Sequence, residues 1–370
     1  MADVTRLIKQ RAGELGFQKV GICPAQAPRH LPLLADWLDR GHHGTMQWME
    51  RTREKRLDID KVLPEVRSVV VVGLNYFSEG PNASSGFRIS RYAHGADYHP
   101  IIEKRLQSLA AYLTELQPGA SVRTYCDTGP VSEKVWAEAA GIGWQGKHSN
   151  LISKEYSSWL FLGVLLTDAS LEYDQPATDH CGSCTRCIEA CPTQAITEPY
   201  VVDSRRCISY LTIEHRGIIP EALRSGIGNW IYGCDICQEV CPWNRFHRPS
   251  VEPDFQPSAF IAAEDPIQWL ELSPEEFSRR FAGSPLSRAR WAGMLRNLII
   301  ATGNARDPRL GPPLAKALDH PEPLVRGHAA WALGRCPLQG AQDALQRRLA
   351  SETDPWIRAE ISSALSSAGE

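Results

Sequence analysis

Apolar and polar residues along the first 175 positions alternate in short blocks that predict a mixed α/β domain. Apolar runs at Val20–Ile22, Val69–Tyr76 and Leu160–Thr167 predict buried strands. Apolar residues at helical spacing predict a helix over Pro100–Leu116. A second helix is predicted over Pro130–Ala140, because proline is favoured in a first helical turn.

The pattern changes twice further along the chain. Most cysteines lie in residues 176–250, and residues 251–284 have the proline-bearing pattern of a connector. From residue 285 onward, three similar segments begin with proline and continue into an apolar helix pattern: Pro285–Asn304, Pro323–Cys336 and Pro355–Leu365. They predict a short HEAT-type helical-repeat domain over residues 285–370, with a plain helical bundle as the alternative.

Composition and charge narrow the class of protein. The formal net charge of the 370 residues is -3, so a basic coat for nucleic acid is not indicated. No apolar run approaches the roughly 18 residues that a membrane span requires. The N-terminal "MADVTRLIKQRAGELGF" has the pattern of an amphipathic helix rather than of a secretion signal. We therefore expect a cytoplasmic protein with no membrane partner.

Eight of the eleven cysteines lie between Cys181 and Cys241. In a reducing compartment, such crowding indicates metal binding rather than disulfides. The stretch "CGSCTRCIEACP" has the spacing C-x2-C-x2-C-x3-C-P, which builds four-iron clusters in bacterial ferredoxins. A second set, ending in Cys241 and Pro242, matches the last three positions of the same run. Ile231 stands at the missing first position, and Cys207 is the spare thiol that can replace it.

In two-cluster ferredoxins the fourth cysteine of each run serves the other cluster. This logic predicts two [4Fe–4S] clusters in a ferredoxin-like domain. One is held by Cys181, Cys184, Cys187 and Cys241, and the other by Cys191, Cys207, Cys234 and Cys237. Structural zinc is the alternative, but it prefers paired C-x2-C motifs with a long gap. The remaining Cys23, Cys126 and Cys336 are predicted to be packing residues.

Three further motifs, in order along the chain, resemble the epoxyqueuosine reductase family. They are "RISRYAHGADYH" (Arg88–His99), "YCDTGPVSEKVWAEAAGIGWQGKHSNLI" (Tyr125–Ile152) and "CISYLTIEHRG" (Cys207–Gly217). The resemblance covers almost the whole chain. It implies an α+β multidomain fold with a nitroreductase-like α/β domain that binds cobalamin over residues 1–175. The two-cluster domain over residues 176–250, the connector and the HEAT-like repeats would follow.

The resemblance also implies an activity. The family reduces epoxyqueuosine to queuosine at the wobble position (34) of tRNA anticodons, which is the final step of queuosine biosynthesis. Electrons would pass through the two clusters to cobalamin. By resemblance Asp127 is the proton donor, and its pKa would then have to be raised by burial. Local sequence alone favours another role for Asp127, as a cap of the helix near Pro130, and the two roles can coexist.

Other residues are expected near the cofactor or substrate, although each also has a plain structural interpretation. His99 follows Asp97 in a segment that can equally be a turn with a capping aspartate. The loop "GWQGKHSN" can be an ordinary tight turn, and the segment after Cys207 can be a helix that covers a cluster. The residues assigned to the cofactor pocket are Arg91, Tyr92, Tyr98, His99, Lys147, His148, Ser149 and Thr212.

Binding of tRNA requires lysine and arginine contacts to phosphate. Candidates are Arg51–Arg56, Ser278–Phe281 and the arginines of the repeats, namely Arg288, Arg290, Arg296, Arg326, Arg335 and Arg358. Each of these can instead be solvated surface, and an arginine at a fixed repeat position can brace a turn between helices. An electron donor such as a flavodoxin or ferredoxin is expected, and the chain is expected to be a monomer.

Three other functions remain open at this point. The same cofactors could reduce a small molecule, as in the related reductive dehalogenases. The chain could be an electron-transfer protein whose N-terminal domain only docks a partner, or an iron–sulfur RNA-binding scaffold without turnover. The "DTGPVSEK" motif (Asp127–Lys134) counts against the electron-transfer interpretation.

Overall fold

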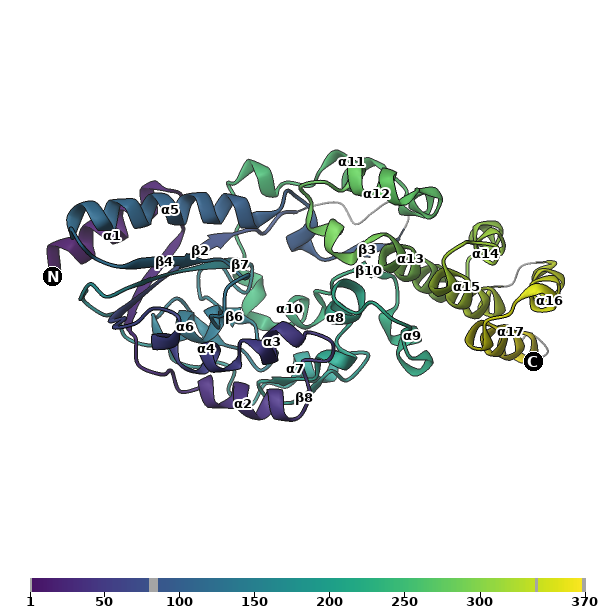
Figure 1. The fold of residues 1–370 in the computed structure, drawn as a ribbon, viewed down its shortest axis with the longest axis horizontal. Coiled ribbons are helices and arrows are strands. Elements are labelled where there is room, and N and C mark those ends of the chain that lie inside the picture. The colour runs from purple at the N-terminus through teal and green to yellow at the C-terminus, as the bar shows by residue number, and fades with distance from the viewer. Residues whose placement is uncertain (1, 80–85, 337–338, 368–370) are drawn as a thin grey trace. The chain divides into compact units, whose positions relative to one another are not determined.

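The computed structural model describes residues 2–79, 86–336 and 339–367 (Figure 1). The described chain forms two compact units. The first comprises Met1–Glu79, Asp97–Arg205 and Asp235–Gln256, and the second comprises Gly80–Ala96, Arg206–Cys234 and Pro257–Glu370. The cysteine segment 176–250 contributes to both units, and the boundaries of the four segments expected from the sequence stay predictions.

A four-stranded sheet forms the centre of the first unit. Its strand order is β1 (Lys19–Pro24), β2 (Ser68–Asn75), β7 (Leu160–Thr167) and β4 (Val122–Tyr125), and all neighbours are antiparallel. Every residue of β2 is buried, which explains its continuous apolar run. The three strands predicted from apolar runs are therefore confirmed.

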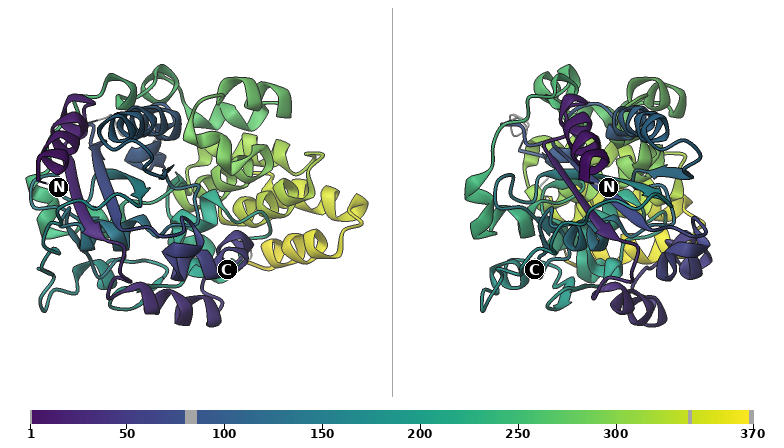
Figure 2. Two further views of the ribbon diagram at one scale, coloured as in Figure 1. Left: turned by 60° about the vertical axis from the view of Figure 1, so that its left-hand side comes forward. Right: turned by 90° about the vertical axis from the view of Figure 1, so that its left-hand side faces the viewer.

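Helices cover both faces of this sheet. Helices α1 (Ala2–Glu14) and α5 (Tyr98–Leu116) lie side by side on one face, and α6 (Glu133–Ala139) packs on the other (Figures 1 and 2). Gly163 in β7 permits close approach of α5, because a Cβ there would lie 2.9 Å from Leu106 Cδ1. The predicted helix over Pro100–Leu116 is confirmed. The second begins at Glu133 rather than at Pro130.

The first unit also contains the short elements around the cysteines. Helices α7 (Arg186–Glu189) and α10 (Ile236–Glu239) pack against each other, and each is followed by a Cys-Pro pair. This repetition is the pseudo-symmetry expected of two ferredoxin halves. The remaining elements of the unit are α2 (Leu31–Asp39), α3 (Gln47–Arg51), α4 (Arg53–Leu57), β5 (Trp144–Gln145), β6 (Leu151–Ile152), β8 (Ile196–Glu198) and β9 (Val201–Val202).

The second unit is mainly helical. A short parallel pair, β3 (Arg88–Ile89) and β10 (Trp230–Tyr232), accompanies helices α8 (Ile208–Ile213), α9 (Glu221–Ile227), α11 (Ala259–Ala263) and α12 (Pro274–Arg280). The C-terminal helices are α13 (Trp291–Ala305), α14 (Gly311–Ala317), α15 (Pro323–Arg335), α16 (Ala341–Ser351) and α17 (Pro355–Ser367).

Helix α15 packs against both α13 and α17, and small residues line these contacts. A Cβ on Gly303 would lie 2.8 Å from Ala332, and one on Gly334 would lie 2.7 Å from Ala364. The three repeated proline-led segments therefore correspond to successive stacked helices, as predicted. Among the described residues, no helix has the length and apolar character needed to span a membrane.

The three cysteines outside the cluster runs pack inside the fold. Cys23, Cys126 and Cys336 are all buried free thiols. Burial raises the pKa of Cys23 to about 12, so this thiol stays protonated. Their environments are those predicted for packing residues.

Candidate functional site

Asp127 lies in the turn between β4 and α6, in a backbone conformation that is unusual for a residue with a side chain. Its φ is +60°, in the left-handed region that non-glycine residues rarely adopt. Its backbone N–H donates to Glu133 Oε1 at 2.8 Å. Such strain persists only where neighbouring contacts maintain it, and it occurs often at functional sites. The side chain remains 56% exposed.

Two residues at the start of α5 contact the Asp127 carboxylate. The Tyr98 hydroxyl donates to Asp127 Oδ2 at 2.7 Å, and His99 Nε2 lies 3.4 Å from the same oxygen. His99 Nδ1 is 2.6 Å from Asp97 Oδ1, and Asp97 caps α5 by accepting the His99 N–H. The structure thus brings together Asp127, Tyr98 and His99. The capping role considered for Asp97 is confirmed.

Glu133 is a member of this site that the sequence did not reveal. Burial, together with the charge of Asp127, raises the pKa of Glu133 to about 7. Two neighbouring carboxylates therefore differ in environment: Asp127 faces solvent, and Glu133 accepts the backbone N–H that holds the turn. Only the position of Glu133 in the first turn of α6, directly after the Asp127 turn, could have suggested this role.

Arg56 holds the same turn from another direction. Its guanidinium donates to the carbonyl oxygens of Gly129 at 3.1 Å and Val131 at 3.2 Å. Arg56 is buried, and burial lowers its pKa. It is thus unavailable to phosphate, and its assignment within the Arg51–Arg56 phosphate candidate is wrong.

These contacts also explain why α6 starts late. The N-cap of α6 is Ser132, so the alternative role of Asp127 as the helix cap is wrong. Arg56 donates to the carbonyl oxygens of Gly129 and Val131, and these bonds hold residues 129–131 in a turn that precedes the helix. A proline at position 130 is compatible with that turn.

Four of the predicted cluster cysteines line one cavity in the first unit. They are Cys181, Cys184, Cys187 and Cys241. Burial raises the pKa of Cys187 to about 11, and charge on Cys181 and Cys241 adds to this effect. Burial also raises the pKa of Cys241, with contributions from Cys181 and Cys184.

This donor set fits a cationic cluster. Four thiolates that line one small cavity repel one another, and bound iron supplies the positive charge that keeps coordinating thiols deprotonated. Cys241 rather than Cys191 lines the cavity with the first three cysteines. That placement agrees with the swapped ligand pairing.

The loop after β5 forms another wall of the thiol cavity. Lys147 Nζ donates to the carbonyl oxygens of Gly182 at 2.7 Å and Cys184 at 3.0 Å. His148 also lines the cavity and is only 4% exposed. Lys147 and His148 were assigned to the cofactor pocket, but their observed contacts favour a role beside the cysteines. Ser149 follows with a φ of +61°.

The other four cluster cysteines are divided between the two units. Cys191 and Cys237 lie in the first unit, and Cys207 and Cys234 in the second. The Cys191 sulfur accepts the Ala195 N–H at 3.2 Å. The grouping of these four cysteines around a second cluster stays a prediction.

Three residues assigned to the cofactor pocket lie in the second unit. Arg91 and Tyr92 form a short 3-10 turn, and the Tyr92 hydroxyl donates to the Tyr232 hydroxyl at 3.2 Å. Thr212 has no exposed surface. Its hydroxyl donates to Ile208 O at 2.7 Å and accepts the Gly233 N–H at 2.9 Å. Thr212 therefore braces α8, and its burial gives no support to a cofactor contact.

Several repeat arginines make hydrogen bonds that brace the second unit. Arg296 is fully buried and donates to the carbonyl oxygens of Leu211, His215 and Gly217. Arg326 donates to Glu352 at 2.8 Å, and Arg358 donates to Glu352 O at 2.9 Å. The phosphate-contact role is therefore wrong for the buried Arg296.

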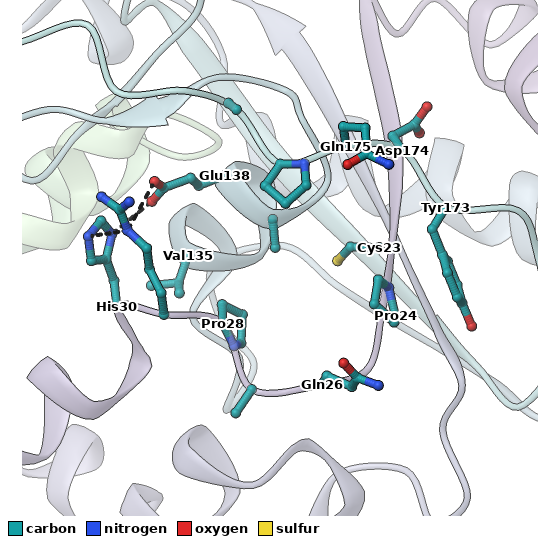
Figure 3. A pocket seen from close by; sticks show the side chains of 15 residues that line it. Cys23, Pro24, Gln26, Pro28, His30, Val135, Glu138, Tyr173, Asp174 and Gln175 are labelled. Atoms are coloured by element: carbon teal, nitrogen blue, oxygen red, sulfur yellow. Dashed lines mark hydrogen bonds and ion pairs between the residues drawn. The ribbon is translucent and has the colours of Figure 1, made fainter.

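A second cavity of about 420 Å³ in the first unit contains none of the predicted site residues. It lies between the end of β1, α6 and the segment Tyr173–Ala177 (Figure 3). At one end His30 Nδ1 lies 2.8 Å from Glu138 Oε2, a contact drawn in Figure 3. This contact joins the start of α2 to α6.

Three protein families match separate parts of the chain. The family described as "Epoxyqueuosine reductase QueG, DUF1730" matches residues 56–128, which include Asp127. A "4Fe-4S double cluster binding domain" matches residues 180–244, and "HEAT repeats" match residues 292–366. The predicted two-cluster domain and the predicted HEAT-type repeats are confirmed, and the plain helical bundle is not.

Relatives match the chain over most of its length. The epoxyqueuosine reductase of Cellulophaga algicola is 42% identical over 79% of this chain and 96% of its own. A solved epoxyqueuosine reductase in complex with an epoxyqueuosine-modified tRNA-Tyr stem loop is 30% identical, with a TM-score of 0.91 over 100% of this chain and 99% of its own. The Bacillus subtilis enzyme has a TM-score of 0.89 at 30% identity, over 99% of each chain. Its solved structure is described with an aspartate catalytic loop swung out of the active site.

Proposed function

Because this chain belongs to the epoxyqueuosine reductase family, we propose that it reduces epoxyqueuosine to queuosine at the wobble position of tRNA anticodons. The chain is therefore an oxidoreductase. The reaction consumes two electrons and two protons: both carbon–oxygen bonds of the epoxide break, a carbon–carbon double bond forms, and the oxygen leaves as water.

The Asp127 turn is the observation that carries this proposal. An alkoxide released from the epoxide must be protonated, and a positioned acid supplies that proton. Asp127 presents an exposed carboxylate, while Tyr98 and His99 orient its Oδ2. The related Bacillus subtilis enzyme is described as having an aspartate catalytic loop, which supports the choice of an aspartate as the acid. Asp127 is therefore the proposed proton donor.

The surroundings of Asp127 indicate what would favour the protonated form of its carboxylate. With 56% of the side chain exposed, protein contacts do not bury Asp127. The burial needed to favour its protonated form would come from bound cofactor and substrate. Glu133 and Arg56 hold the backbone of the turn, so the carboxylate itself remains directed outward.

Eight cysteines are the proposed cluster ligands. The first set is Cys181, Cys184, Cys187 and Cys241, and the second is Cys191, Cys207, Cys234 and Cys237. The family match over residues 180–244 and the four thiols around one cavity support this proposal. When bound, such clusters supply low-potential electrons one at a time.

Cobalamin is the proposed second cofactor. The support is the family resemblance and the demand for a centre that collects two electrons delivered singly. Both ring nitrogens of His99 already face carboxylates, at 2.6 Å and 3.4 Å. His99 is therefore better suited to orient Asp127 than to ligate cobalt. Tyr98, Arg91, Tyr92 and Ser149 remain proposed neighbours of the cofactor.

The proposed partner is the anticodon stem loop of a tRNA that carries epoxyqueuosine. The related structure with a modified tRNA-Tyr stem loop supports this choice. A base within a stack cannot present its modification to a protein site, so the wobble base is expected to be splayed out. A tRNA substrate also supports a cytoplasmic location. The proposed electron donor is a flavodoxin or a ferredoxin, and the proposed oligomeric state of the chain is a monomer.

Nucleoside mass analysis tests this function. Anaerobically reconstituted protein, a low-potential reductant and tRNA bearing epoxyqueuosine are incubated with and without added cobalamin. We expect the nucleoside to lose one oxygen atom only when cobalamin is present. If the nucleoside keeps its oxygen although both clusters and cobalamin are bound, the tRNA reductase proposal is wrong and a small-molecule substrate becomes the better assignment.

A further inference from the structure

The loop between β5 and β6 places two buried nitrogen atoms beside the thiol cavity. His148 lines the cavity with the four cysteines, and its Nε2 has no hydrogen-bond partner among the described residues. Trp144 is 1% exposed, and its Nε1 also has no hydrogen-bond partner among those residues. Buried polar groups in proteins are nearly always hydrogen-bonded. The two unpartnered nitrogens therefore indicate acceptors that belong to a bound group or to its sulfur ligands.

The local structure determines which nitrogen of His148 carries the proton. Nδ1 accepts the backbone N–H of Asn150 at 3.2 Å. In a neutral imidazole the other nitrogen is then the donor, so Nε2 carries the hydrogen. His148 is therefore a donor through Nε2.

Gly146 makes room for this arrangement. A Cβ at position 146 would lie 3.0 Å from His148 Cε1 and 3.3 Å from Nε2. It would also lie 2.6 Å from Ile152 Cδ1. Any side chain at position 146 would thus displace the imidazole edge, which explains a glycine in the middle of this loop.

Trp144 packs against two residues that line the thiol cavity, His180 and Trp243. The indole ring packs edge-on against Trp243, with ring centroids 4.9 Å apart. Lys147 fixes the loop by its bonds to Gly182 O and Cys184 O.

We propose that Trp144 and His148 are positioning residues that donate hydrogen bonds to the cluster held by Cys181, Cys184, Cys187 and Cys241, and that they set its reduction potential. This inference rests on the proposed function, because it requires a cluster at these cysteines. N–H donors to cluster sulfur stabilise the more negative, reduced form. Removal of either donor should therefore make this cluster harder to reduce and leave the other cluster unchanged.

The His148→Asn substitution tests the imidazole. Asparagine keeps a side-chain acceptor for the backbone N–H of Asn150. It has no N–H donor at the place that His148 Nε2 occupies. His148→Gln can restore a donor there. His320→Asn is the matched control, because His320 Nδ1 accepts the Glu322 N–H at 3.1 Å in the same local pattern, within the repeat helices.

Redox titration of the full-length, iron-loaded protein, followed by electron paramagnetic resonance, supplies the readout. In His148→Asn one of the two midpoint potentials should fall by about 59 mV, which corresponds to roughly tenfold in the one-electron reduction equilibrium. His148→Gln should recover most of this shift, and His320→Asn should show none. Trp144→Phe should also lower one potential. Trp136→Phe is its control, because Trp136 is an equally buried indole in α6.

The outcomes separate this inference from the proposed function. Unchanged potentials in His148→Asn or in Trp144→Phe, with two four-iron clusters still bound, would overturn the inference and leave the function intact. Loss of iron from both His148→Asn and His148→Gln would also overturn it, because His148 would then serve cluster assembly. Wild-type protein that binds no iron after reconstitution would contradict the proposed function itself.

Discussion

At the scale of single residues, the proposed chemistry depends on one carboxylate and the groups that orient it. Asp127 has a strained backbone, Tyr98 donates to its carboxylate, and Glu133 accepts its N–H. Its side chain caps no helix and is not buried among protein atoms. These features agree with a residue held for contact with a substrate.

Substitution of Asp127 tests this role. We expect Asp127→Asn to retain both clusters and bound cobalamin while turnover falls by about 10²- to 10⁴-fold, because a general acid is lost. Single-turnover kinetics with iron and cobalamin analysis check this result. Asp343→Asn, an exposed change on α16, is the control. Full activity of Asp127→Asn would remove Asp127 from the mechanism.

The raised pKa of Glu133 predicts that the stability of the fold depends on pH. Its pKa is about 7 in the fold and near its ordinary value of 4.5 when unfolded, so its ionisation opposes folding. The resulting loss of stability begins as pH rises above about 4.5 and is complete above about pH 7. Glu133→Gln keeps an acceptor for the Asp127 N–H and should remove this loss.

The measurement is the anaerobic thermal midpoint between about pH 5 and 8. The advantage of Glu133→Gln over wild type should grow as pH rises through this window. Glu172→Gln, at an exposed glutamate, should follow the wild-type profile. A constant difference between Glu133→Gln and wild type would show that Glu133 does not titrate in this range.

At the scale of elements, the repeat helices are joined by buried charges. Glu352 follows α16 and is almost fully buried. Burial alone would raise the pKa of Glu352, but hydrogen bonds from Arg326, Arg348 and backbone N–H groups lower it to about 2. This carboxylate therefore stabilises the fold above its unfolded pKa, and the contribution is lost as pH falls towards 2.

Glu352→Gln should weaken the helix stack. A pKa lowered from 4.5 to about 2 corresponds to roughly 3 kcal/mol of stabilisation at neutral pH. Hydrogen exchange of the amides in α15 and α17 at pH 7 should show local opening that is easier by about this amount. Glu271→Gln breaks an exposed pair with Lys316 and should cost less than about 1 kcal/mol. If Glu271→Gln and Glu352→Gln cost the same stability, Glu352 does not brace the repeat helices.

At the scale of the whole molecule, the crossed ligand pairing is the feature with the sharpest consequence. The thiol cavity contains Cys241, which is 60 residues from Cys181 in the numbering and close to it in space. A consecutive pairing would instead group Cys191 with the first three cysteines. The two assignments predict opposite results for two double variants.

The crossed pairing predicts that Cys181→Ala with Cys241→Ala removes ligands of one cluster only, which leaves about four iron atoms per chain. Cys181→Ala with Cys191→Ala should damage both clusters. Iron analysis and Mössbauer spectra of anaerobically purified variants check this. Reversed results would establish the consecutive pairing and exclude the crossed one.

Much of the fold could be predicted from local patterns. Strands β2 and β7 were recognised because their apolar runs are continuous, and helices α15 and α17 because each begins with proline. The start of α6 was misplaced, since two hydrogen bonds from Arg56 hold the preceding turn out of the helix. These bonds join residues more than seventy positions apart, and no local pattern contains them.

The sequence by itself determined the family, the candidate thiol ligands and the candidate acid, because these depend on residue types at short, fixed spacings. Only the tertiary structure decided what surrounds them. It placed His148 and Lys147 beside the cysteines and Glu133 behind Asp127. It also buried Arg56 and Arg296, which the sequence alone had made candidates for contact with phosphate. The physical reason is that burial and hydrogen-bond partners arise when distant segments pack, and spacing along the chain does not specify that packing.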